Sequence, residues 1–200
     1  VLGHATFADT GTTTSPTNST LNGPVGLAVD SAGSVYVAVP NDNRVLVFPA
    51  GATSGSAAKL VVGQLDFSSN QANPSSAPLA SPRSFSGVTD VKLDPKGNLY
   101  AADAGNNRVV YFPANAITAT KVWGQNDFTA NGANQIKASG LNAPYKVAVD
   151  YSQQPFALYV SDTNNHRVLG WRDSVRFRTG DPADLVIGQH HADQERFVTD

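Results

Sequence analysis

The sequence contains no cysteine and no methionine among its 200 residues. The absence of cysteine excludes disulfides, thiolate zinc sites and cysteine nucleophiles. Charged residues make up only 15% of the chain, and the net charge is -2, so there is no positive field to collect nucleic-acid phosphates. No apolar run reaches the ~18 residues of a membrane span. We therefore expect neither a nucleic-acid partner nor membrane insertion.

A repeated phrase is the main feature of what the sequence does contain. Its closing part, Asn-Arg-Val or His-Arg-Val followed by apolar residues, occurs three times, at 43–48, 107–112 and 166–171. A second phrase, Gly-Gln-x-Asp-Phe or a looser form of it, recurs at glycines about 60 residues apart: Gly3, Gly63, Gly124 and Gly188. This period is too long for a helical solenoid and fits one four-stranded sheet with its loops.

Each copy of the repeat predicts four short strands, because short apolar runs rich in β-branched and aromatic residues alternate with turn residues. The predicted strands are 27–29, 35–39, 45–48 and 60–62 in the first copy, 99–102, 109–112 and 121–123 after an inner strand ending at Asp94 in the second, and 147–149, 158–161, 168–171 and 185–187 in the third. If Pro82 is aligned with Pro24 and Pro144, the second copy carries an insertion at 84–89.

Three such sheets in tandem predict an all-β fold, a single-domain β-propeller segment over residues 1–200 with three four-stranded antiparallel blades. The blades are expected at 21–63, 79–124 and 141–188, and residues 1–7 are expected to form the last strand of a preceding blade. Three blades leave two open edges, so the ring is incomplete unless further chain or a second copy of this chain completes it. The absence of methionine and of a leader at Val1 also suggests a mature or excised segment of a longer protein.

The stretches 99–109 (Leu-Tyr-Ala-Ala-Asp-Ala-Gly-Asn-Asn-Arg-Val) and 158–168 (Leu-Tyr-Val-Ser-Asp-Thr-Asn-Asn-His-Arg-Val) resemble the NHL repeat. Three copies cover most of the chain, and the resemblance implies a larger propeller of about six blades. The first copy departs from the pattern, with Val39-Pro-Asn-Asp in place of the stretches that begin at Asp103 and Asp162. Whatever those two aspartates do, the first blade is expected to do without it.

Strand direction alternates within a blade, so the loop after the fourth strand and the turn between the second and third strands emerge at the same end. We call this end of the sheets the rim. The candidate rim binding residues are Asn43, Arg44, Lys92, Asn107, Arg108, Asn165, His166 and Arg167. Because most of them recur in every copy, a structural role is the favoured interpretation. Lys92 is different, because it replaces Ala28 and Ala148 on an inner strand and is expected to face the channel and pair with a carboxylate.

No catalytic residue is predicted, because the sequence offers neither a nucleophile elbow nor a unique pair of carboxylates. The resemblance implies that some related propellers are lyases or hydrolases with metal ligands in the central channel. The histidines are His4, His166, His190 and His191, and they do not come from several different blades. No cofactor is therefore predicted, although a divalent metal in the channel stays open because other blades could supply ligands.

The favoured functional hypothesis is a non-catalytic binding or scaffolding propeller that presents its polar rim to a protein or glycan partner. One alternative is a metal-dependent lyase or lactonase-type enzyme with its site in the channel. Another is a structural subunit that pairs through its open edges, as a homo-oligomer or within a longer parent chain. A low-charge composition rich in Ser, Thr and Asn favours a bacterial protein that is secreted, at the cell surface or in the periplasm.

Overall fold

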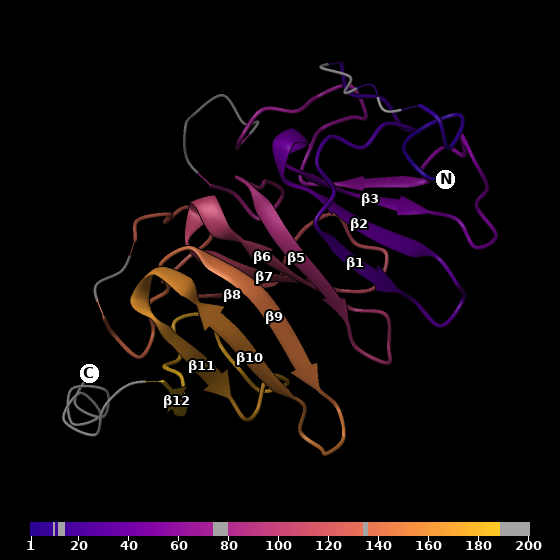
Figure 1. The fold of residues 1–200 in the computed structure, drawn as a ribbon. Coiled ribbons are helices and arrows are strands. Elements are labelled where there is room, and N and C mark those ends of the chain that lie inside the picture. Colours follow the sequence, from indigo (N-terminus) through magenta and orange to yellow (C-terminus); the bar gives the residue numbers. More distant parts are fainter. Residues whose placement is uncertain (10, 12–14, 74–79, 134–135, 189–200) are drawn as a thin grey trace.

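The computed structural model describes residues 1–9, 11, 15–73, 80–133 and 136–188. Within these ranges the chain forms three four-stranded antiparallel sheets (Figure 1). The strands are β1 (Gly26–Val29), β2 (Val35–Val39), β3 (Arg44–Phe48) and β4 (Leu60–Val62) in the first sheet, β5 (Val88–Leu93), β6 (Leu99–Asp103), β7 (Arg108–Phe112) and β8 (Lys121–Trp123) in the second, and β9 (Pro144–Asp150), β10 (Ala157–Asp162), β11 (Arg167–Trp171) and β12 (Leu185–Ile187) in the third. The predicted all-β architecture of three four-stranded blades is confirmed.

Strand order follows the chain in every sheet, so each blade is a meander whose first strand lies innermost. A short 3-10 turn joins the second strand to the third in each blade. These turns are η1 (Pro40–Asp42), η2 (Ala104–Asn106) and η3 (Thr163–Asn165). The inner strands β1, β5 and β9 lie beside one another, and the described chain forms an arc of three blades rather than a closed ring (Figure 1).

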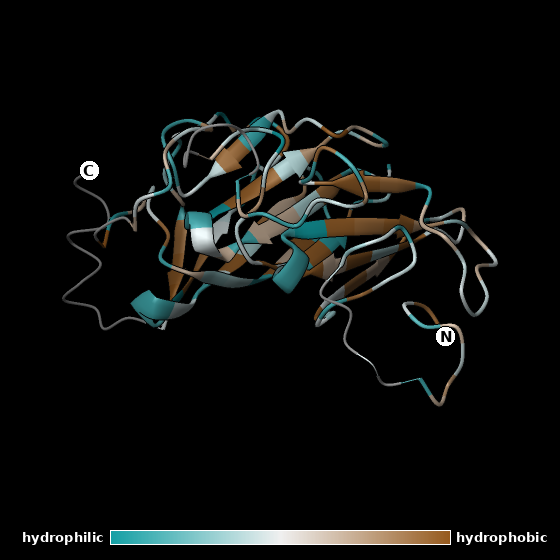
Figure 2. Cartoon of the chain, turned by 90° about the horizontal axis from the view of Figure 1, so that it is seen from above, coloured by the Kyte–Doolittle hydropathy of each residue, from teal (hydrophilic) through white to brown (hydrophobic). Residues whose placement is uncertain are grey.

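Apolar side chains fill the spaces between the blades. Val45 and Val47 of the first blade pack with Val91, Val110 and Phe112 of the second in one buried cluster. The next space holds a second cluster, which includes Trp123, Leu158 and Leu169. Burial of each such side chain contributes about 1.5–3 kcal/mol, so contacts between blades hold the array together. The strands are accordingly the most hydrophobic part of the chain, and the turns are mostly polar (Figure 2).

A residue with a positive φ stands at the entry to each inner strand, directly before β5 and β9 and three residues before β1, and it fixes the alignment of the three copies. These residues are Gly23 (70°), Gly87 (65°) and Ala143 (49°). Val88, and not Pro82, is therefore equivalent to Pro24 and Pro144. The expected insertion at 84–89 is wrong, because the additional length of the second copy lies in the loop between β4 and β5, ahead of the inner strand.

Residues 1–7, expected to be the last strand of a preceding blade, form no strand here. A strand needs a ladder of hydrogen bonds, and residues 1–7 form none with a strand among the described residues, although Leu2 packs against the side chains of β2 and β3. This segment runs instead along the first blade, where the Val1 amino group donates to Ser54 Oγ at 2.7 Å. The Gly55 N–H donates to the His4 carbonyl at 3.1 Å. The described residues contain no helix long and apolar enough to cross a membrane.

Candidate functional site

The three 3-10 turns end in Asn43, Asn107 and His166, and these residues explain part of the repeated phrase. All three adopt the left-handed conformation, with φ of 50°, 52° and 54°. The N–H of each donates to the carbonyl of the first residue of its turn. Asparagine tolerates this conformation better than most residues. The phrase therefore specifies how the chain turns from the second strand into the third.

The two asparagines also connect neighbouring blades. Asn43 Oδ1 accepts a hydrogen bond from the Gly87 N–H at 2.7 Å, and Asn107 Oδ1 accepts one from the Ala143 N–H at 2.9 Å. Their amide groups donate at 2.9 Å to the carbonyls of Asn70 and Asn131 in the loops of the rim. Each asparagine therefore joins its own turn, a rim loop and the next blade.

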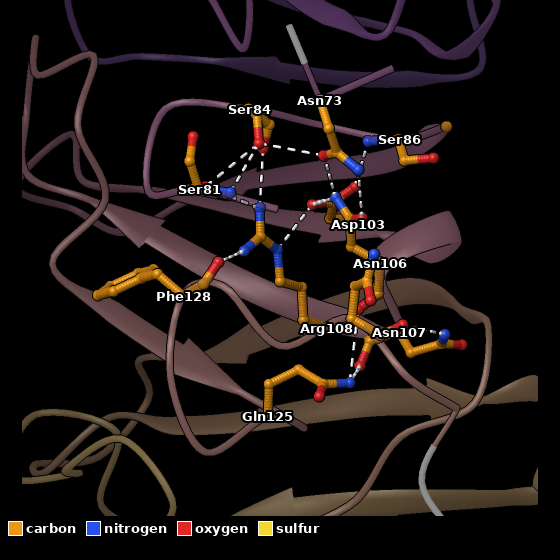
Figure 3. A network of polar contacts seen from close by, with 12 residues as sticks. Asn73, Ser81, Ser84, Ser86, Asp103, Asn106, Asn107, Arg108, Gln125 and Phe128 are labelled. Atoms are coloured by element: carbon orange, nitrogen blue, oxygen red, sulfur yellow. Dashed lines mark hydrogen bonds and ion pairs between the residues drawn. The ribbon is translucent and has the colours of Figure 1, made fainter. Parts of the chain in front are cut away.

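Arg108 is the centre of a buried network in the second blade (Figure 3). Its Nε lies 2.8 Å from Asp103 Oδ2, and the side chains of both residues are fully buried. Its Nη1 donates to the Phe128 carbonyl at 2.7 Å, and its Nη2 donates to the Ser81 and Ser84 carbonyls at 2.9 Å. The guanidinium thus binds backbone both before the inner strand and after the fourth strand.

Asp103 completes this network. Its Oδ1 accepts from the Ser86 N–H at 2.7 Å, and its Oδ2 accepts from the Asn106 amide at 2.7 Å as well as from Arg108 (Figure 3). Burial raises the pKa of the Asp103 carboxyl, while the charge of Arg108 and these hydrogen bonds act in the opposite direction. The pair is surrounded by protein, so it holds the blade and is inaccessible to a ligand.

The third blade repeats this arrangement, and the first blade achieves it differently. Arg167 Nε lies 2.7 Å from Asp162 Oδ2, while Arg44 Nη2 lies 3.0 Å from Asp42 Oδ2. Asp42 stands at the place of Asn106, three residues after Val39. The expectation that the first blade does without this carboxylate is therefore wrong, because Asp42 supplies it from a neighbouring position. Burial lowers the pKa of the Arg44 guanidinium, and Asp42 opposes that shift.

The second phrase, Gly-Gln-x-Asp-Phe, has a similar structural role. The Gln64 amide donates to the carbonyls of Asn43 at 2.9 Å and Gln71 at 2.8 Å, and Gln125 makes the matching bonds in the second blade. Gly63 has a φ of 95°, and a Cβ there would lie 2.1 Å from the Phe85 ring. The phrase therefore fixes a tight turn that packs against the next blade.

The recurring rim candidates are thus engaged within the protein. The guanidiniums of Arg44, Arg108 and Arg167 lie in residues at most 4% exposed. Asn165 donates to Asp162 Oδ2 at 2.8 Å, as Asn106 does to Asp103. His166 is exposed at the outer edge of the third blade. Of the predicted binding residues, His166 and Lys92 are the ones with side chains that reach solvent and do not repeat a buried contact.

Lys92 lies on the inner strand β5 and pairs with a carboxylate, as expected. Its Nζ is 3.0 Å from Asp90 Oδ1 and 3.2 Å from Oδ2, and it also donates to the Val91 carbonyl at 3.0 Å. The Asp90 side chain is 3% exposed and that of Lys92 is 39% exposed. Asp90 is not among the residues predicted from the sequence, although the corrected alignment identifies it as another break in the repeat.

A second lysine reaches the same carboxylate from the third blade. Lys146 Nζ, on β9, lies 3.8 Å from Asp90 Oδ1, and the neighbouring Val147 N–H donates to Asp90 Oδ2 at 3.2 Å. The first blade also approaches, because a Cβ on Gly26 would lie 2.8 Å from the Asp90 Cα. All three inner strands therefore meet at Asp90, near the rim.

The rim loops expose large apolar side chains. Leu65 after β4 is 69% exposed, and Ile136 before β9 is 62% exposed. Phe7, which is 87% exposed, belongs instead to the N-terminal segment, which contacts the loop between β3 and β4 at the opposite end of the blade. Tyr145, at the start of β9, is 47% exposed. Among the described residues, the loops after β4 and before β9 thus each present a large apolar side chain to solvent.

The described residues include no group of three or more His, Asp or Glu side chains placed to hold a metal ion. His4 lies beside Asp9, with 3.5 Å between Nδ1 and Oδ1. His190 and His191 lie outside the described residues. The expected absence of a cofactor stays a prediction.

No protein-family model matches this chain, and no curated protein matches it. Among solved structures, a periplasmic gluconolactonase of Pseudomonas aeruginosa matches with 12% identity and a TM-score of 0.54, over 84% of this chain and 40% of that one. A streptogramin B lyase matches with 13% identity and a TM-score of 0.47, over 78% and 42% of the two chains. A virginiamycin B lyase of Staphylococcus aureus matches with 11% identity and a TM-score of 0.44, over 74% and 38%.

The chain therefore spans about two fifths of the length of these structures. They are β-propeller proteins, and the likeness to the gluconolactonase shows that the three sheets are blades of the β-propeller fold. At this identity the likeness concerns the fold alone. Assignment to the NHL repeats specifically stays a prediction.

Proposed function

We propose that this chain is part of a binding propeller that takes a protein or glycan partner at its rim. The observation that carries the proposal is that the repeated polar side chains and the apolar side chains at this end of the blades have different roles. Repeated Asp, Arg, Asn and Gln side chains hold the turns and loops, whereas Leu65 and Ile136 project into water. Large exposed apolar side chains on rigidly held loops are typical of interaction surfaces.

The chemistry of the rim favours a protein over a glycan within this proposal. Apolar anchors surrounded by polar groups are the usual centre of a protein interface. The Ser, Thr and Asn residues of the same loops supply hydrogen bonds around them. Location outside the cytoplasm, whether secreted, at the cell surface or in the periplasm, belongs to the same proposal and rests on composition.

The competing proposal is a lyase or lactonase-type enzyme with its site in the channel. The likeness to the solved gluconolactonase and lyases motivates this proposal, but at 11–13% identity that likeness concerns the fold alone. A stoichiometric divalent metal together with hydrolysis of a sugar lactone would favour it. Either proposal is compatible with pairing through open blade edges, which concerns assembly rather than chemistry.

Substitution of the rim anchors tests the binding proposal. The variant Leu65→Ser, Ile136→Ser is compared with a matched control at the opposite end of the blades, Ile117→Ser, Val175→Ser. Immobilised wild-type chain is probed with a panel of purified envelope proteins and with a glycan array. We expect the rim variant to lose at least tenfold in affinity for any ligand found and the control to lose less than twofold. Equal losses in both variants, or no ligand in either panel, would overturn the proposal.

A further inference from the structure

Apart from Asp150 at the end of β9, the charged residues of the inner strands gather at one place, and the alignment of the repeat shows this. The corrected alignment places Gly26, Asp90 and Lys146 at equivalent positions of β1, β5 and β9. Two residues further on, the equivalent residues are Ala28, Lys92 and Ala148. The first blade thus shows that small residues satisfy these positions. The charged residues in the second and third blades go beyond what the blade itself needs.

These charged groups do not balance. Lys92 and Lys146 both approach Oδ1 of Asp90, at 3.0 and 3.8 Å, so two ammonium groups share one carboxylate. The cluster has an excess of one positive charge. Two ammonium groups that approach the same carboxylate oxygen repel each other. A second anion at this place would complete the balance.

The negative group of this cluster is buried, whereas the two positive groups are partly exposed. Asp90 is 3% exposed and receives the Val147 N–H, so the carboxylate lies inside. The lysine side chains are 39% and 50% exposed, so the surface that meets solvent is cationic. The Tyr145 ring, with 5.3 Å between its centroid and Lys146 Nζ, borders this surface and is itself half exposed. A ligand would therefore meet two ammonium groups beside an aromatic face.

We propose that Lys92, Lys146 and Asp90 form a binding site for a small oxyanion, the carboxylate or phosphate group of a ligand, on the inner strands near the rim. The anion bridges the two ammonium groups and accepts charge-assisted hydrogen bonds from both. Asp90 is a positioning residue that brings the lysines of two blades together. The site is separate from the apolar rim anchors, so it does not depend on the function proposed for them.

Titration of the 200-residue chain with inorganic phosphate and with glucuronate, followed by amide NMR, tests the site. We expect a saturable shift of the Val147 amide, which bonds Asp90, at millimolar ligand and low salt. Lys92→Met and Lys146→Met should each weaken binding about tenfold. Lys96→Met, which removes an equal charge from an exposed turn at the opposite end, should change it less than twofold. A response to phosphate only, or to glucuronate only, supports the site and identifies the source of the anion.

Asp90→Asn gives a result of opposite sign. Removing the internal carboxylate leaves two positive charges without a partner, so the external anion should bind about fivefold tighter, even if the variant is less stable. Weaker binding in Asp90→Asn, equal binding in Lys92→Met and wild type, or no saturable shift with either anion would each overturn the proposal. Thermal unfolding of every variant identifies one that fails to fold. If Asp90→Asn does not fold, the two lysine variants still test the site independently of each other.

Discussion

The inner strands of the first and second blades carry similar residues in different surroundings. Leu27 and Val29 on β1 are each 62% exposed, whereas Val91, the equivalent of Leu27 on β5, is fully buried. On β9 the equivalent residue, Val147, is 3% exposed. Residue type does not explain the difference, because all of these side chains are aliphatic. What differs is the neighbour: the second and third blades each have a preceding blade to cover this face.

The same contrast holds on the other face of the blades. Tyr36 and Tyr100 are 5% and 2% exposed because the following blade covers them, whereas Tyr159 of the third blade lies partly in solvent. Tyr159 lines a hollow of about 410 Å³ together with Arg172 and Asp184. Within the part of the chain that the structure describes, the array therefore presents one open face at each side. The faces are suited to another blade, whether from a longer chain or from a second copy.

The largest loss of stability should come from breaking a buried ion pair, and it should be similar in the first and second blades. Asp103→Ala leaves Arg108 buried without a counter-charge, and the free energy of unfolding should fall by about 3–5 kcal/mol in urea denaturation. Asp42→Asn should be similarly costly for Arg44. Adding Val39→Asp to Asp42→Asn recreates the arrangement of the second blade.

This double variant should recover more than half of the stability that Asp42→Asn loses. Recovery would mean that a carboxylate at either position can pair with the buried arginine. A double variant less stable than Asp42→Asn alone would show that the carboxylate position is specific to each blade. The comparison of blades would then have to be made position by position.

Polar substitution of the inner-strand aliphatics tests the effect of the neighbouring blade directly. Val91→Ser should lower the free energy of unfolding by about 3 kcal/mol, because it loses apolar burial and buries a hydroxyl. Leu27→Ser, at the equivalent place, should cost less than about 0.5 kcal/mol in the isolated chain. If a second copy covers β1 in solution, Leu27→Ser should instead abolish a dimer seen by light scattering.

Alkaline pH provides a third comparison. Burial raises the pKa of Tyr100 to about 12, so the folded protein disfavours the phenolate. In the unfolded chain this tyrosine ionises near its ordinary pKa of 10.0, so its contribution to stability is complete below that pH and is lost as the pH rises toward 12. The loss should be about 2 kcal/mol. Tyr100→Phe should remove it, whereas Tyr159→Phe on the open face should leave alkaline unfolding as in the wild type.

Much of the fold could be predicted because the repeat is written in local signals. Alternating apolar runs give the strands to within a few residues, and Gly33 and Gly97 mark the hairpins of the first two blades. The alignment of the inner strands could not be obtained in this way. It depends on the positive φ of Gly23, Gly87 and Ala143, and the third of these is an alanine that no glycine pattern reveals.

The candidate site was predictable only in part, for a physical reason. Lys92 was visible because it breaks a repeat of alanines. Asp90 was hidden because β5 contains an irregularity between Val88 and Asp90, which shifts the pairing with β6. Lys146 reaches Asp90 from 56 positions along the chain, and such contacts follow from how blades pack rather than from any local pattern. Asp42 was not predicted for a related reason. It lies three residues after Val39, the equivalent of Asp103, and its carboxylate still reaches the equivalent guanidinium.

The smallest effect should appear at the residues that end the 3-10 turns. Asn107→Gly relieves the left-handed backbone but removes the bonds to Asn131 and Ala143, so we expect a net loss of about 1 kcal/mol. His166 occupies the same place at the open edge with a φ of 54°, and His166→Gly should stabilise the chain by about 0.5 kcal/mol. Changes of opposite sign in the free energy of unfolding, measured in urea, would show that this residue forms the turn in every blade but contacts a neighbouring blade only where one is present. A loss at both positions would mean that the third blade, too, uses this residue for a contact with a further blade.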